Sequence, residues 1–223
     1  MRMLFLSMAV SAAACAQALT AVWDLSSAGG GTQTTNGGTL YTNIWGETQK
    51  EGTFALKVAY SMSSMTGTTA VAIGPQASLP TAYGGTGANN WRSTPSVSVR
   101  EGQDGAQSSL ALYHGNGSQH GPYAYDPVSA PITMVITVTW TNGNYADVAF
   151  YCNGDHLLTL LAQYMPDYVD SIYFGRDVDV QEAVFYRGRL TEEEAMGLSV
   201  PEPTTLAMLA LGVAVLTLRR SAA

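Results

Sequence analysis

The chain has 223 residues, of which 17 are acidic and 10 basic, giving a net charge of −7. Between Leu19 and Ser199 there are sixteen acidic and seven basic residues, a net charge of −9. Such a surface repels nucleic acid and anionic lipid, which excludes a nucleic-acid partner, while it tolerates neutral glycans and attracts cations.

The first 18 residues have the pattern of a secretory signal peptide. Arg2 precedes the apolar run Met3–Ala14, and Ala16-Gln17-Ala18 supplies the small residues of a cleavage site. We expect residues 1–18 to form a signal helix that the export machinery uses and a peptidase removes. A buried N-terminal helix and lipidation of Cys15 are the alternatives.

Residues 19–199 predict one all-β domain, long enough to bury a substantial core. Short alternating runs are separated by Gly, Asn and Pro, which is typical of antiparallel sandwiches. In chain order, the predicted strands are Thr20–Leu25, Thr53–Ser61, Ala70–Ile73, Ser96–Arg100, Ser108–Tyr113, Ile132–Trp140, Asp147–Cys152, His156–Leu161, Ser171–Phe174 and Val178–Tyr186. The predicted long loops are Gly29–Asn36, Tyr83–Thr94 and His114–Pro131.

The clearest strand, Ile132–Trp140, alternates so that one face is packed and the other, rich in threonine, is partly solvated. Asn142-Gly143 predicts a hairpin with positive φ angles. Asn153-Gly154 turns the chain again, which gives a meander of three strands. A short helix follows the last strand, because Thr191 and Glu194 form a capping box.

Cleavage of the signal peptide leaves Cys152 as the one thiol of the domain, so an internal disulfide is excluded and the domain depends on its core. Cys152 follows Val148 and Phe150 on the inner face of its strand. We therefore predict a buried thiol that packs as a small hydrophobe, in preference to a reactive one.

Three segments of the C-terminal half resemble laminin G-like domains, which have the concanavalin A-like lectin fold. Val148–Asp155 resembles their strand with a Tyr-x-Asn-Gly-acid turn, and Ile172–Gly175 resembles a strand end. Ala183–Glu194 resembles their closing strand, which leads into a Leu-Ser/Thr-x-x-Glu helix start. The order and spacing agree over Ile132–Leu198. The resemblance implies a jelly-roll sandwich of two antiparallel sheets.

Residues 200–223 resemble the PEP-CTERM sorting signal of Gram-negative bacteria. Pro201-Glu202-Pro203 precedes the apolar run Thr204–Leu218, and Arg219 and Arg220 follow. Fifteen residues are few for a bilayer that needs about 20, but snorkelling and local thinning cover the difference. The arginines favour a cytoplasmic C-terminus, with the domain outside. We expect a short transmembrane helix that anchors the chain until a sorting peptidase removes it; an unprocessed anchor is the alternative.

One carboxylate series invites an enzymatic interpretation. Asp177, Asp179 and Glu182 resemble the Glu-x-Asp-x-x-Glu motif of a glycosidase family with this fold, whose paired carboxylates act as acid and nucleophile. Here the first acid is Asp, and the motif lies at the end of the domain within the closing strand. No Gly-x-Ser-x-Gly elbow or zinc spacing accompanies the histidines His114, His120 and His156. We therefore predict that the protein is not an enzyme. A glycosidase that uses Asp179 and Glu182 is kept as a less favoured hypothesis.

No cofactor is predicted, although calcium is open because many relatives use it. Four carboxylates could converge at strand ends to hold the ion: Asp147, Asp155, Asp177 and Asp179. An Asp-x-Asp-x-Asp-Gly loop is lacking. Acidic, solvated turns are the alternative.

Glycan binding needs aromatic platforms and polar groups on a rigid edge. The loop around residues 113–126 has that composition, with tyrosines that can stack on sugar rings. The predicted ligand-binding residues are Tyr113, Asn116, Tyr123, Tyr125 and Asp126, with Trp45 and Trp91 from other Gly- and Asn-rich segments. The alternative is that this loop closes the edge of the sandwich and its tyrosines plug the core.

We therefore predict an exported, surface-displayed, non-catalytic binding or adhesion module that recognises a carbohydrate or another surface protein. The alternative is a structural protein of an extracellular matrix or envelope layer with no small-molecule site. The predicted location is the cell envelope, with membrane attachment through the C-terminal segment.

Overall fold

The computed structural model describes residues 19–33, 37–44, 53–63, 69–74, 97–101, 110–113, 119–164 and 169–201. The predicted signal helix, the loop Tyr83–Thr94 and the apolar run Thr204–Leu218 lie outside these ranges. Within them, no helix is long and apolar enough to cross a membrane.

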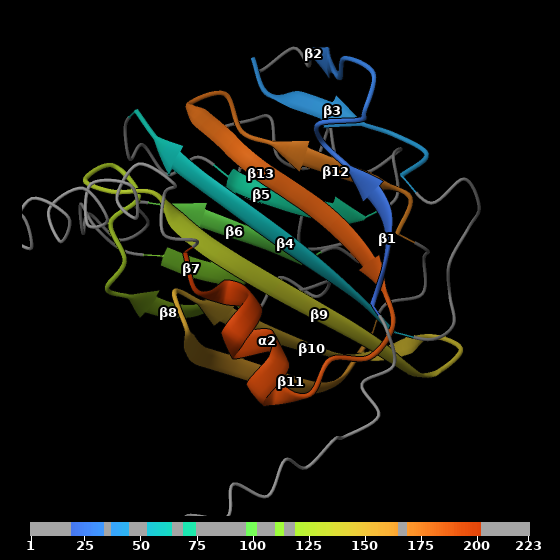
Figure 1. The fold of residues 1–223 in the computed structure, drawn as a ribbon. Helices are drawn as coiled ribbons and strands as arrows, with labels where there is room; N and C mark the ends of the chain where they lie inside the picture. Colours follow the sequence, from blue (N-terminus) through green and yellow to red (C-terminus); the bar gives the residue numbers. More distant parts are fainter. Residues whose placement is uncertain are drawn as a thin grey trace, which may run out of the picture.

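The described residues form thirteen strands and one helix (Figure 1). In chain order these are β1 (Thr20–Asp24), β2 (Thr32–Gln33), β3 (Thr39–Tyr41), β4 (Thr53–Met62), β5 (Thr69–Gly74), β6 (Val97–Glu101), β7 (Leu110–Tyr113), β8 (Gln119–Tyr123), β9 (Ile132–Asn142), β10 (Tyr145–Cys152), β11 (Asp155–Tyr164), β12 (Ser171–Phe174), β13 (Val178–Arg187) and α2 (Glu192–Ser199).

Two antiparallel sheets face each other. The six-stranded sheet has the order β1-β13-β4-β9-β10-β11, and the seven-stranded sheet has the order β2-β3-β12-β5-β6-β7-β8. In Figure 1 the six-stranded sheet lies in front of the seven-stranded one, and α2 covers part of its outer face. This arrangement confirms the predicted all-β, two-sheet jelly-roll sandwich.

The core lies between the sheets and follows from alternation along the strands. In β4, Phe54, Leu56, Val58 and Tyr60 are each at most 2 % exposed and point to the same side. Other strands contribute matching residues: Met134 and Ile136 from β9, Val148, Phe150 and Cys152 from β10, Val71 and Ile73 from β5, Ile172 and Phe174 from β12, and Ala183 and Phe185 from β13. Cys152 is fully buried, which confirms the predicted thiol packing.

The outer face of the six-stranded sheet is partly apolar because α2 covers it. Ala195 of the helix packs with Val135, Ala149 and Tyr151, all buried. The partly solvated, threonine-rich face predicted for β9 is therefore correct only in part: Thr137 and Thr139 are half-buried, whereas Thr133 and Val135 are buried. The sequence pattern missed this because the covering element comes sixty residues later.

The helix begins as predicted. Thr191 Oγ1 accepts a hydrogen bond from Glu194 N at 3.2 Å, and Thr191 N donates to Glu194 Oε2 at 2.8 Å. Its other end is fixed to the turn between β10 and β11, where Gly154 N donates to Ser199 Oγ at 2.9 Å. Ser199 in turn donates to Met196 O at 2.8 Å. The capping box and this serine therefore hold both ends of α2.

The two Asn-Gly turns differ from each other. Positive φ angles occur at Asn153 (50°) and Gly154 (92°), the pair that joins β10 to β11. The positive φ angles predicted at Asn142-Gly143 are wrong, because β9 continues through Asn142, which pairs with Tyr145, and the turn falls one residue later. The hairpin itself is present.

Three short strands were not predicted. β2 lies in the predicted loop Gly29–Asn36, and β8 lies in the predicted loop His114–Pro131. β8 contains Gly121 and Pro122, which disfavour a central strand but are tolerated at an edge, where β8 lies. β3 was too short to show alternation.

We predict opposite effects of alanine at Gly197 of α2 and at Gly154 of the β10–β11 turn. Gly197→Ala should raise the free energy of unfolding by about 0.5–1 kcal/mol, because a Cβ at this helical position meets nothing within 4 Å. Gly154→Ala should lower it by more than about 1 kcal/mol, because its φ is +92°. Urea unfolding of both variants measures this. If Gly197→Ala lowered the free energy of unfolding, the open space described at this position of α2 would be contradicted.

Candidate functional site

A pocket of about 310 Å³ opens where β1, β2 and β3 meet. Its volume lies at the small end of the range for ligand sites, roughly 300–1,000 Å³. The residues that line it come from β1, from the loop before β2 and from β3 with the residues that follow: Trp23, Ala28, Gly29, Gly30, Gly31, Thr32, Leu40, Tyr41, Thr42 and Asn43.

One side of the pocket is an aromatic wall made of Trp23 and Tyr41. Their rings meet edge to face with centroids 5.6 Å apart. Trp23 also contacts Phe185 at 6.4 Å, and Tyr41 contacts Phe174 at 6.0 Å. Both outer rings are half-buried. Edge-to-face contacts with core rings fix their orientation, so the aromatic wall is pre-organised.

The aromatic wall joins the two sheets. Trp23 belongs to β1, at one edge of the six-stranded sheet, and is paired with Phe185 of β13. Tyr41 belongs to β3, next to the edge of the seven-stranded sheet, and is paired with Ile172 of β12. The pocket is therefore built where the edges of both sheets meet, and neither sheet forms it alone.

A second part of the lining is a glycine wall, Gly29–Gly31, which follows the turn after β1. Asp24 Oδ1 accepts a hydrogen bond from Ser26 N at 2.7 Å, and Asp24 O accepts one from Ala28 N at 2.9 Å. A Cβ on Gly31 would lie 2.8 Å from the Tyr41 ring, so only glycine allows this close approach. A Cβ on Gly29 or Gly30 would meet nothing within 4 Å.

The polar groups of the pocket are uncharged. Thr32, Thr42 and Asn43 supply hydroxyl and amide groups, and the glycine wall supplies main-chain N–H and C=O groups without covering side chains. Asn43 has a φ of 55°, a left-handed conformation that asparagine adopts more readily than most residues. None of the lining residues that the structure describes carries a charge.

Two of the tyrosines predicted to bind ligand, Tyr123 and Tyr125, lie elsewhere, and their hydroxyls are engaged. Tyr125 Oη donates to Asp155 Oδ2 at 2.9 Å, and Tyr123 Oη to Leu157 O at 3.5 Å. Both rings pack against the core. Burial raises the pKa of both phenols, and the hydrogen bond to Asp155 raises the pKa of Tyr125 further.

The other residues predicted to bind ligand are not seen to form a site with Tyr123 and Tyr125. Asp126 accepts hydrogen bonds from the main-chain N–H groups of Val128 and Ser129, and from the Ser129 hydroxyl, which lowers its pKa. Tyr113 ends β7, where its main chain pairs with Gln119. Asn116, Trp45 and Trp91 lie outside the described residues.

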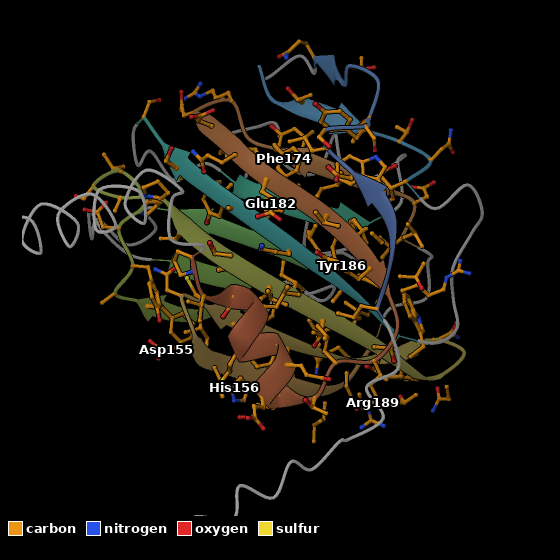
Figure 2. All side chains as sticks on the ribbon, in the orientation of Figure 1. Asp155, His156, Phe174, Glu182, Tyr186 and Arg189 are labelled. Atoms are coloured by element: carbon orange, nitrogen blue, oxygen red, sulfur yellow. The ribbon has the colours of Figure 1, made fainter. Side chains whose placement is uncertain are left out.

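The pocket and the tyrosines occupy different edges of the sandwich. Phe174, which contacts Tyr41, and Asp155, which binds Tyr125, are widely separated in Figure 2. The structure therefore does not bring Trp23 together with Tyr123, Tyr125 or Asp126. Ligand binding at the tyrosines stays a prediction. The sequence did not predict this pocket, because its Trp, glycine run and Tyr are separated along the chain and form no recognisable motif.

The candidate catalytic carboxylates are each engaged locally. Glu182 forms an ion pair with the buried Lys57 at 2.9 Å on the outer face of the six-stranded sheet (Figure 2). Asp179 accepts from Gln181 at 3.3 Å, and Asp177 accepts from Arg176 at 3.1 Å. A register shift between Val180 and Glu182 sets Asp179 opposite Ser61 and Glu182 opposite Ala59, so these two acids share the outer face of the sheet, where Glu182 is already paired with Lys57.

The predicted calcium ligands do not form a cluster. Asp147 accepts from Ala162 N at 2.8 Å, and Asp155 is bound to Tyr125. Within the described part of the chain, no group of three or more His, Cys, Asp or Glu side chains could hold a metal ion. His156 lies 3.2 Å from Glu192 of α2 and 2.8 Å from the Thr159 hydroxyl, and Figure 2 shows it beside the helix.

Comparison with known proteins supports both sequence resemblances. Residues 199–221 match the PEP-CTERM protein-sorting motif, which confirms the resemblance predicted for the C-terminal segment. The individual roles of Pro201, Glu202, Pro203, Arg219 and Arg220 stay predictions. No curated protein matches the chain.

Solved structures similar to this chain include lectin-like domains. The CBM40 domain of a Ruminococcus gnavus IT-sialidase, bound to α2,3-sialyllactose, is 14 % identical, with a TM-score of 0.51 over 81 % of this chain and 100 % of that one. The Emp46p carbohydrate recognition domain is 11 % identical, with a TM-score of 0.43 over 71 % and 82 %. The botulinum neurotoxin serotype C1 binding domain is 11 % identical, with a TM-score of 0.46 over 72 % and 40 %. The likeness to the CBM40 domain shows that the fold is that of a lectin-like jelly roll.

We predict that Tyr125→Phe lowers the free energy of unfolding by about 1 kcal/mol at pH 8, because it removes the hydroxyl that donates to Asp155. Folding raises the pKa of Tyr125, so the unfolded chain loses the phenolic proton first as the pH rises above about 10. The stability that this phenol contributes is therefore present below pH 10 and is lost above it.

Urea unfolding between pH 8 and pH 11 measures this effect. The Tyr125→Phe variant should lose stability less steeply with pH than the parent. Tyr123→Phe is the control, since its hydroxyl makes a longer bond and should give a smaller change. Parallel pH profiles for the parent and Tyr125→Phe would contradict the prediction.

Proposed function

We propose that the chain is an exported, surface-displayed carbohydrate-binding module without catalytic activity, and that its site is the pocket between β1, β2 and β3. The observation that carries the proposal is that the aromatic wall of Trp23 and Tyr41 and the glycine wall line one pocket, on a lectin-like fold. Sugar sites combine a rigid aromatic surface with a few fixed polar groups, and this pocket has both.

The chemistry of the pocket suits a sugar ring. Sugars offer C–H groups on their faces and hydroxyls on their edges, so they pair with an aromatic ring and with neutral donors and acceptors. The rings of Trp23 and Tyr41 are half-buried, so part of their surface remains available to the C–H face of a sugar. Neutral donors and acceptors for the sugar hydroxyls come from Thr32, Thr42, Asn43 and the glycine main chain. The volume favours one residue of a longer glycan.

The lining residues also argue against hydrolysis at this site. Glycoside cleavage uses two carboxyl groups that flank the scissile bond, and the lining residues within the described ranges include none. Glu182, the strongest candidate acid, lies on the outer face of the sheet with Lys57. A non-catalytic role therefore fits the pocket better than a glycosidase does.

The location follows from the two ends of the chain. Residues 1–18 serve as the export signal, and the sorting motif supports recognition by a sorting peptidase. The apolar run Thr204–Leu218 holds the protein in the membrane until it is processed. The domain then meets glycans or other surface proteins outside the cell. Tyr113, Asn116, Tyr123, Tyr125 and Asp126 are a second proposed contact surface, with Trp45 and Trp91.

We predict that the full chain in detergent binds on a glycan array and that Gly30→Leu weakens binding at least tenfold. The new side chain starts in open space at the pocket wall, so it obstructs the pocket without straining the fold. Gly143→Leu is the matched control, because its Cβ also meets nothing and it lies in the β9–β10 turn. If no glycan on the array bound, a structural envelope protein would be favoured. If Gly30→Leu and Gly143→Leu bound equally well, the binding site would not be this pocket.

We also predict that incubation with the bound glycans releases no reducing sugar. Any release should be compared with that by an Asp179→Ala, Glu182→Ala double variant. Release by the parent that the double variant abolishes would establish the glycosidase hypothesis instead.

A further inference from the structure

We infer that the pocket accepts an uncharged sugar residue and rejects sialic and uronic acids. This inference rests on the proposed function and specifies its ligand class. It does not follow from the fold, because the similar CBM40 domain was solved with α2,3-sialyllactose, an acidic sugar.

The described lining of the pocket contains no cationic group of the kind that an acidic sugar needs. A carboxylate that leaves water requires a cation or several directed donors, and arginine is the usual partner because it binds both oxygens. The lining consists of apolar, hydroxyl, amide and glycine residues. An anionic sugar placed there would lose hydration without gaining an ion pair, which is unfavourable.

The charges around the pocket reinforce this selectivity. Asp24 directly follows Trp23 and uses its carboxylate to hold the turn that carries the glycine wall. Asp170 O accepts a hydrogen bond from Ile44 N, which brings a second acidic residue next to Asn43. Arg176 lies near Gly37, but its Nε binds Asp177 at 3.1 Å. Two acidic residues thus adjoin segments of the described lining, and the guanidinium of Arg176 is already paired with a carboxylate.

The domain as a whole acts in the same direction. Its net charge of −9 between Leu19 and Ser199 disfavours the approach of an acidic polysaccharide, most strongly at low salt. A neutral sugar experiences neither this repulsion nor the local one. The hydroxyls of Thr32 and Thr42 and the Asn43 amide can both donate to and accept from sugar hydroxyls. The pocket thus fits a ligand with many hydroxyls and no charge.

The test adds the missing cation. A Gly30→Lys variant places an ammonium group at the pocket wall from a position with free space, and Gly143→Lys adds the same charge at the β9–β10 turn. The probes are glucose, galactose, mannose, N-acetylglucosamine, N-acetylneuraminic acid, glucuronic acid and the pair lactose and α2,3-sialyllactose. Binding to the full chain in detergent is measured by calorimetry and by ligand-observed NMR.

We expect the parent to bind at least one neutral probe and to bind every acidic probe at least tenfold more weakly. Gly30→Lys should strengthen binding of an acidic probe about tenfold, as one new charge-assisted hydrogen bond provides. Gly143→Lys should leave the selectivity unchanged. Preference of the parent for an acidic probe, or an equal gain in both lysine variants, would overturn this inference while leaving carbohydrate binding intact. Failure of the parent to bind any probe or any array glycan would overturn the proposed function itself.

Discussion

The contact between Trp23 and Tyr41 is the constraint on which the candidate site depends. Each ring comes from a different sheet, and each is held against a core phenylalanine, Phe185 or Phe174. The register of β1 with β13 and of β3 with β12 thus determines where the rings lie. The glycine wall depends on the same contact, since Gly31 approaches Tyr41 too closely for any Cβ. A shift in either sheet would therefore alter both sides of the pocket.

Aromatic residues at the two edges of the sandwich have different roles for a reason that composition does not reveal. At the β8 edge, Tyr123 and Tyr125 direct their hydroxyls to main-chain and carboxylate acceptors, which closes the core. At the β1 edge, Trp23 and Tyr41 make ring-to-ring contacts and remain half-exposed toward a cavity. A tyrosine-rich loop is compatible with either outcome. Which one occurs depends on acceptors that lie about thirty residues away in sequence.

Much of the fold could be predicted because it follows from local patterns. Alternation identified the long strands β4, β9, β10 and β13, and the Thr191–Glu194 spacing identified the start of α2. The short strands β2, β3 and β8 have too few residues for alternation, and β8 contains Pro122. The pocket was beyond local patterns, because it unites Trp23 with Tyr41, eighteen residues apart and in different sheets. Its value as a site comes from packing, which single-sequence spacing does not encode.

Ser199 joins the folded domain to the sorting segment. It ends α2, it bonds to Gly154 at the β10–β11 turn, and it is also the first residue of the sorting motif. Only Val200–Pro203 separate it from the apolar run, a tether of at most about 14 Å. The tether starts on the β9–β11 side of the six-stranded sheet, and β1 with the pocket lies at the opposite edge, about 24 Å across. If the tail anchors the chain as proposed, this short tether keeps the domain near the membrane and leaves the pocket at the sheet edge away from the point of attachment.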